Sequence, residues 1–196
     1  MVLKGGNMLV KNILKNVITF LNINELLDIK PFGGTSDPTS EQTELINLLI
    51  NATNLVCNQI ASEYYPIKQT KTISTSTGMV SYSTISTTPI VDILSVKIND
   101  IDVSYQCYPT YLKTQAGTLD ICYASSPSVA TSVSSNIDFY NYRINERVIA
   151  YGVVAEYHFI NGNYDDATIW DNRFKNSLNS VIRPKREIKV KERLWI

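Results

Sequence analysis

A change of hydrophobic period along the chain constrains the fold most strongly. Near both ends, apolar side chains recur at intervals of three and four residues, as in amphipathic helices. Between about residues 67 and 124, apolar and β-branched residues instead alternate with polar ones, as in strands. The sequence therefore predicts an α+β fold, in which a helical bundle contains an inserted antiparallel β module and is followed by an extended arm.

The helices have recognisable boundaries. A first helix is expected over Met8–Leu21, with Ile13, Val17 and Leu21 on one face. A second is expected from Thr39, as N-cap of a capping box closed by Gln42, to about Tyr64, just before Pro66. Its predicted core positions are Leu45, Leu48, Leu49, Ala52, Leu55, Val56 and Ile60.

Two further helices are expected near the other end of the chain. Residues 145–160 would bury one stripe, and Gly162 would cap the helix; the next helix begins near Asp165 and buries a second stripe. Since only "NGNY" joins them, they should form an antiparallel hairpin packed against the helix that begins at Thr39. The two stripes are Ile144, Val148, Tyr151, Ala155, Phe159 and Ala167, Trp170, Phe174, Leu178, Val181.

The middle of the chain is rich in hydroxyl side chains. Twelve of the nineteen residues from Thr70 to Thr88 are Ser or Thr, which suggests a polar hairpin around Gly78. Turns near Asn99-Asp100, Pro109 and Ala116-Gly117 then divide three or four strands, which predicts a compact antiparallel sheet or small barrel. Residues 125–136 would be a flexible connection.

These patterns divide the chain into four parts. Residues 1–66 hold the N-terminal helices of the bundle, and residues 67–136 the inserted β module with its Ser/Thr-rich linkers. Residues 137–182 form the C-terminal helical hairpin that completes the bundle, and residues 183–196 an extended basic docking arm.

The sequence offers little for catalysis. His158 is the only histidine, and it lies in an apolar helix, so packing is the expected role. Cys57, Cys107 and Cys122 have no metal-site spacing and are expected to be reduced core residues. The pairs Asp100/Asp102 and Asp165/Asp166 are typical of turns and caps. We expect no enzyme activity, no cofactor and no metal.

No stretch of the sequence approaches the run of about 18 apolar residues that a membrane span needs. Near the start, Lys11 and Lys15 interrupt "MLVKNILKNVITFL", which favours an amphipathic helix over an export signal. The expected location at synthesis is therefore intracellular, with no membrane partner.

The segment "RPKREIKVKERLWI" concentrates positive charge. Its six Lys/Arg and two Glu give a net charge of +4, so residues 1–182 must carry −4, because the whole chain is neutral. Its apolar residues alternate with polar ones, as in a strand. It could pair with the β module of its own chain, add to a sheet edge of another protein, or hold phosphate. The candidate partner-binding residues are Arg183, Lys185, Arg186, Ile188, Lys189, Val190, Lys191, Arg193, Leu194, Trp195 and Ile196.

The order of elements resembles that of the head-to-tail connector (adaptor) proteins of tailed bacteriophages. The specific part is "ERVIAYGVVAEYHFINGNYDDATIWDNRFKNSLNSVI" followed by a basic extended segment with Arg193 and Trp195 near its end. The large Ser/Thr-rich insertion departs from the commonest pattern of that family.

The resemblance implies a homo-oligomeric ring, usually of twelve copies, whose arm docks on the portal protein. Further neck or tail proteins would be partners, and DNA would pass through without specific binding. The location would be the virion neck, and the host cytoplasm during assembly. The alternatives are a DNA-binding or packaging accessory protein that uses the basic arm, and a tail-completion or minor capsid protein.

Overall fold

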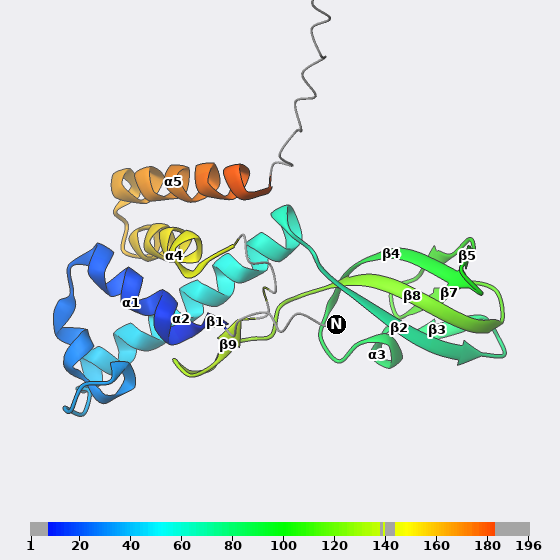
Figure 1. Ribbon diagram of the computed structural model, residues 1–196, viewed down its shortest axis with the longest axis horizontal. Coiled ribbons are helices and arrows are strands. Elements are labelled where there is room, and N and C mark those ends of the chain that lie inside the picture. Colours follow the sequence, from blue (N-terminus) through cyan, green and yellow to red (C-terminus); the bar gives the residue numbers. More distant parts are fainter. Residues whose placement is uncertain (1–7, 138, 140–143, 183–196) are drawn as a thin grey trace, which may run out of the picture.

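The computed structural model describes residues 8–137, 139 and 144–182 (Figure 1). The longer helices occupy one end of the molecule and most strands the other, and the sheets are antiparallel. The chain is therefore a mixed α+β protein, as the change of hydrophobic period predicts.

The first helix, α1 (Val10–Leu21), starts two residues later than expected. Met8–Leu9 form strand β1, which pairs antiparallel with β9 (Asn136–Ile137). The helix buries Ile13 and Val17 completely and Leu21 in part. Asn22 ends it in the left-handed conformation (φ 57°), where an asparagine is tolerated well.

Helix α2 (Ser40–Gln59) follows two short 3₁₀ turns, η1 (Asn24–Asp28) and η2 (Lys30–Phe32). Both hydrogen bonds of the predicted capping box between Thr39 and Gln42 are present. The π-helical turn η3 (Ile60–Tyr64) extends α2 to the expected end.

One predicted core position of α2 is wrong. Leu55 is 54% exposed, whereas Ile46, Ile50 and Thr53, which were not predicted, are buried. The buried face of α2 is turned from the expected one because both α1 and α4 (Glu146–Ile160) pack against this helix.

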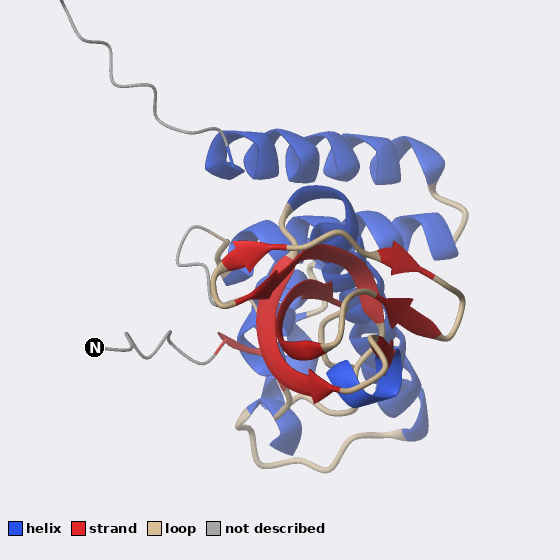
Figure 2. Cartoon of the chain, turned by 90° about the vertical axis from the view of Figure 1, so that its right-hand side faces the viewer, coloured by secondary structure: helices blue, strands red, loops and turns tan. Residues whose placement is uncertain are grey.

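The strands form two main sheets. One has the order β2-β8-β4-β5 and the other β3-β7-β6. Viewed end-on, they curve around a common centre (Figure 2). Their bounds are β2 (Ile67–Thr75), β3 (Met79–Ser81), β4 (Ile90–Ile98), β5 (Ile101–Asp102), β6 (Gln106–Cys107), β7 (Tyr111–Lys113) and β8 (Gly117–Ser125), with the short helix α3 (Tyr82–Ile85) after β3.

The expected hairpin around Gly78 is wrong, although the turn exists. β2 pairs along its whole length with β8, and β3 pairs with β7, so the chain changes sheet at Gly78. β8 buries Leu119, Ile121 and Tyr123, and it offers the polar β2 an apolar neighbour that β3 is too short to supply. Gly78 has φ 71°, and a Cβ there would overlap the carbonyl oxygen of Thr114.

The other predicted turns are present, and Asn99 and Asp100 both adopt positive φ, as a tight hairpin turn requires.

The segment of residues 125–136 is not a flexible connection. The Asn54 side-chain amide donates to the carbonyl of Ala130 (2.9 Å), and its oxygen accepts from the Ala130 N–H (2.8 Å). The backbone N–H groups of Val10 and Lys11 donate to Ser135 (3.0 Å) and Val133 (2.8 Å). This segment fastens the strand region to α1 and α2.

The helices α4 and α5 (Tyr164–Ile182) form the predicted hairpin. Gly162 (φ 76°) donates to Phe159, and Asn163 donates to His158, which closes α4 as a Schellman motif. α4 is buried on nearly every side from Val148 to Ala155, because α1, α2 and α5 all pack on it. Of the two hairpin helices, α4 makes the predicted contact with α2, while α5 covers the outer side of α4. Phe159, predicted to be buried, is 39% exposed.

Two separate hydrophobic cores result. One joins α1, α2, α4 and α5, and it includes Ile67 at the start of β2, Ala130 in the segment after β8, and Ile137 of β9. The other lies among the strands and is formed by Val80, Ile85, Ile93, Val96, Leu112, Leu119, Ile121 and Tyr123.

Candidate interaction surface

All eleven predicted partner-binding residues, from Arg183 to Ile196, lie outside the described residues. The structure does show their point of attachment, since α5 runs to Ile182 on the outside of the helical layer (Figure 1). The surface of α4 and α5 is therefore the described surface next to the predicted partner-binding residues.

The residues considered for catalysis are scattered. His158 is half-buried on α4, and its Nδ1 is enclosed without a hydrogen-bond partner in the described part of the chain. Cys57 is buried and Cys122 half-buried, but Cys107 is exposed, so the expectation of three core cysteines is wrong for Cys107. No three His, Cys, Asp or Glu residues among those described converge as a metal site would require.

One open pocket of about 280 Å³ lies beside β4. It is lined by Tyr82, Ile90, Val91, Asp92, Ile93 and Cys107. Burial and a hydrogen bond with the Cys107 thiol raise the pKa of Tyr82, so its hydroxyl stays protonated. The volume is below the range of about 300–1,000 Å³ usual for small-molecule sites.

A cluster of three aromatic rings joins the helices on one side of the hairpin. Phe20 of α1 stacks on Tyr151 of α4 (5.4 Å between ring centroids) and also meets Trp170 of α5 (5.3 Å). The guanidinium of Arg173 lies 4.7 Å from the Trp170 centroid, and that of Arg147 lies 5.7 Å from the Tyr151 centroid. We call these five residues the arginine-aromatic flank.

Both arginines of this flank are exposed and hold their places over the rings by cation-π attraction. Neither forms an ion pair with any carboxylate of the described residues. The flank therefore presents two positive charges above apolar surface, and no carboxylate in the described part of the chain occupies their hydrogen-bond donors.

The other side of the hairpin carries carboxylates. Glu156 of α4 is half-buried, and burial, followed by the neighbouring charge of Asp171, raises its pKa. Asp171 binds Lys175 at 2.7 Å, and this hydrogen bond raises the pKa of Lys175, with smaller contributions from Tyr64 and Glu63 at the end of α2. We call Glu63, Glu156 and Asp171 with Lys175 the carboxylate flank.

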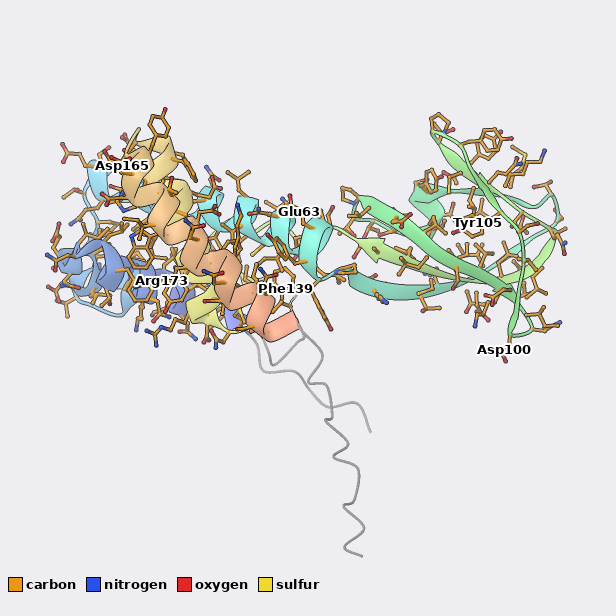
Figure 3. The ribbon with its side chains drawn as sticks, turned by 90° about the horizontal axis from the view of Figure 1, so that it is seen from above. Glu63, Asp100, Tyr105, Phe139, Asp165 and Arg173 are labelled. Carbon is orange, nitrogen blue, oxygen red and sulfur yellow. The ribbon has the colours of Figure 1, made fainter. Side chains whose placement is uncertain are left out.

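The two flanks lie on opposite sides of α5. Phe174 and Leu178 point into the core, and the helical period places Trp170 and Arg173 on one side of that line and Asp171 and Lys175 on the other. Figure 3 shows Arg173 and Glu63 on the two sides of α5. The hairpin is therefore electrically polarised across its width.

Reasoning from the sequence missed both flanks. Arg147 precedes Tyr151 by four residues, and Trp170 precedes Arg173 by three, spacings that let side chains meet on a helix surface. These spacings could have predicted the contacts between the arginines and the rings. The contacts of Phe20 with Tyr151 and Trp170 depend on how α1 packs against α4, so spacing along the chain could not predict them. Comparison with known proteins gives no further assignment, because no family model and no curated protein sequence matches the chain.

Proposed function

We propose that this chain is a structural protein of the neck of a tailed bacteriophage, where copies form a ring that joins the portal to the tail and lets DNA pass. In this proposal, the helices of residues 1–66 and 137–182 form the bundle of the ring body. Residues 67–136 are an inserted β module that contacts a neighbour, and residues 183–196 are an extended arm that docks on the portal.

The observation that carries the proposal is the α4–α5 hairpin. α4 is enclosed by three helices, and α5 leads directly into the basic alternating segment at residue 183. A rigid helical body followed by a segment that can be extended is the arrangement that a docking arm needs. The element order of α1, α2, strands, α4 and α5 also follows the order in the connector proteins that the sequence resembles.

An extended arm can bind by adding a strand to a sheet edge of its partner. Main-chain hydrogen bonds then give affinity, and alternate side chains such as Ile188 and Val190 give specificity. Trp195 would serve as the anchor, because Trp and Arg are the commonest energetic centres of interfaces. In a ring, each weak arm benefits from an effective concentration of about millimolar once its neighbours have docked.

The charge distribution fits a channel through which DNA moves. Residues 1–182 carry a net charge of −4, whereas proteins that hold DNA neutralise its phosphates with a broad basic face. A body with negative net charge would let the duplex slide. The same argument disfavours the DNA-binding or packaging accessory, which would rely on the arm alone.

The deciding experiment compares three arm variants for binding to the purified portal of the same phage. They are a deletion of residues 183–196, Trp195→Ala, and the charge-removal control Lys189→Gln/Lys191→Gln. We expect the deletion to abolish binding while the melting curve of the body is kept. Trp195→Ala should weaken binding by about 2 kcal/mol per arm or more, and the control should have a smaller effect.

A DNA-binding accessory protein gives a different pattern. Its binding to duplex DNA would fall steeply with salt, would fall further in the double-lysine control, and would be indifferent to Trp195→Ala. That pattern, or portal binding that survives the deletion, would overturn the proposal.

A further inference from the structure

Copies in a closed ring meet head to tail, so each copy must present two different surfaces that fit one another. The described residues offer one such pair, the arginine-aromatic flank and the carboxylate flank. The inference below rests on the proposed ring and names the contact between its copies.

The arginine-aromatic flank has the composition of an interface centre. Tyr, Trp and Arg are the residues most enriched at energetic hot spots. Tyr151 is buried, whereas Phe20 and Trp170 are half-buried, and the guanidinium of Arg173 lies over the Trp170 ring. Each guanidinium has a planar fork of donors that matches a carboxylate, and no described carboxylate occupies it.

The carboxylate flank carries negative charge that the cations of the described residues do not fully neutralise. Lys175 is bound to Asp171, so it does not neutralise Glu156. Glu156 has no hydrogen bond or ion pair to any described residue, although burial and Asp171 both disfavour its charged form. Glu63 adds a third carboxylate, held at 3.2 Å by the side-chain amide of Gln59. A cation brought to this flank would relieve like-charge repulsion within the chain.

We propose that the arginine-aromatic flank of one copy docks on the carboxylate flank of the next, with Arg147 and Arg173 bound to Glu156 and Glu63. Because the two flanks lie on opposite sides of α5, the contact is heterologous and passes from copy to copy instead of closing a two-fold dimer. Partial burial strengthens these arginine-carboxylate bonds, and the aromatic rings exclude water from them.

A second copy suits the two flanks better than DNA does. Phosphate could bind the arginines, but it would leave Glu156 on the carboxylate flank without a cation. A second copy of the chain supplies both charges and satisfies both flanks with one contact.

The test is a charge exchange in the full-length chain. One variant, Arg147→Glu/Arg173→Glu, makes both flanks acidic, and the other, Glu63→Lys/Glu156→Lys, makes both basic. Self-association is measured by sedimentation velocity over a concentration series, with Lys15→Glu on α1 and Glu44→Lys on α2, both exposed and outside the two flanks, as controls. Circular dichroism melts verify that each variant is folded.

We expect the wild-type chain and both controls to self-associate, and each reversed variant alone to associate roughly 100-fold more weakly, since like charges at an interface cost several kcal/mol. An equimolar mixture of the two variants should regain association, because every contact then pairs an acidic with a basic flank. A monomeric wild-type chain, undiminished association of the reversed variants, or a mixture that does not recover would overturn the inference. Portal binding is measured separately, so recovery without portal binding would reject the neck function and keep the contact.

Discussion

Gly152 lies where α4 approaches two other helices most closely. A Cβ at this position would come within 2.8 Å of Val56 Cγ1 on α2 and 3.1 Å of Phe174 Cε2 on α5. We expect Gly152→Ala to lower the free energy of unfolding by about 1–3 kcal/mol, because overpacking outweighs the gain in helix propensity. Chemical denaturation measures this.

The matched control is the double variant Gly152→Ala/Val56→Ala, which removes the closest clashing methyl groups. It should be less destabilised than the sum of the two single variants. Additive losses would show that Gly152 is not needed for close helix packing.

The sequence places Phe174 and Trp170 in one buried stripe, but the structure separates them. Phe174 is 1% exposed, whereas Trp170 is half-buried beneath Arg173. Phe174→Ala should therefore cost about 3–5 kcal/mol of unfolding free energy, and Trp170→Ala clearly less. Equal losses in denaturation curves would place the core boundary elsewhere.

The raised pKa of Glu156 predicts a pH dependence of stability. In the folded chain, burial and Asp171 raise its pKa above the ordinary value of 4.5, so folding favours the protonated form. This contribution is complete below pH 4.5 and is lost as the pH rises through the raised pKa. Glu156→Gln should therefore raise the melting temperature relative to wild type more at pH 7 than at pH 4.

The measurement is a set of thermal melts at several pH values, at concentrations where the chain is monomeric, with Glu44→Gln as the matched control. A gain that does not change with pH would contradict the assigned cause. The same Glu156→Gln change should weaken self-association, so one carboxylate would oppose folding and support assembly.

At the scale of elements, the sequence predicted helix caps and tight turns reliably, but it did not predict which strands pair. The capping box at Thr39, the glycine cap at Gly162 and the turn at Asn99-Asp100 depend on a few adjacent residues, and all three are present. The partner of β2 depends on β8, some fifty residues away, and the polar sequence around Gly78 could not reveal it. Contacts between residues far apart in the sequence decide such pairings, and the two hydrogen bonds between Asn54 and Ala130 are another case.

The strand region should be removable from the helices. Its core is separate, and Lys68 faces Ala124 across paired strands, so their Cα atoms are about 4.5–5.5 Å apart. Replacing residues 68–124 with a short Gly/Ser linker keeps Ile67 in the helical core. We expect a helical circular dichroism spectrum and a cooperative melt. A variant that is unfolded or aggregates would show that the helices need the strands to fold.

At the scale of the whole molecule, the helical body is polarised in charge. One flank of the α4–α5 hairpin carries two arginines that pair with no carboxylate among the described residues, the other flank carries carboxylates, and the outer helix α5 leads into the basic segment of residues 183–196. Contacts between flanks would let such a body repeat around the axis of a ring. Residues 183–196 of every copy would then remain available to one common partner.

Electron microscopy of the purified chain mixed with its portal tests the neck-ring assignment most directly. The account predicts rings of this protein stacked coaxially on the portal, with the helical layer forming the continuous contact between copies. Portals that remain bare at concentrations where the chain is folded, or copies bound individually without a ring, would contradict it.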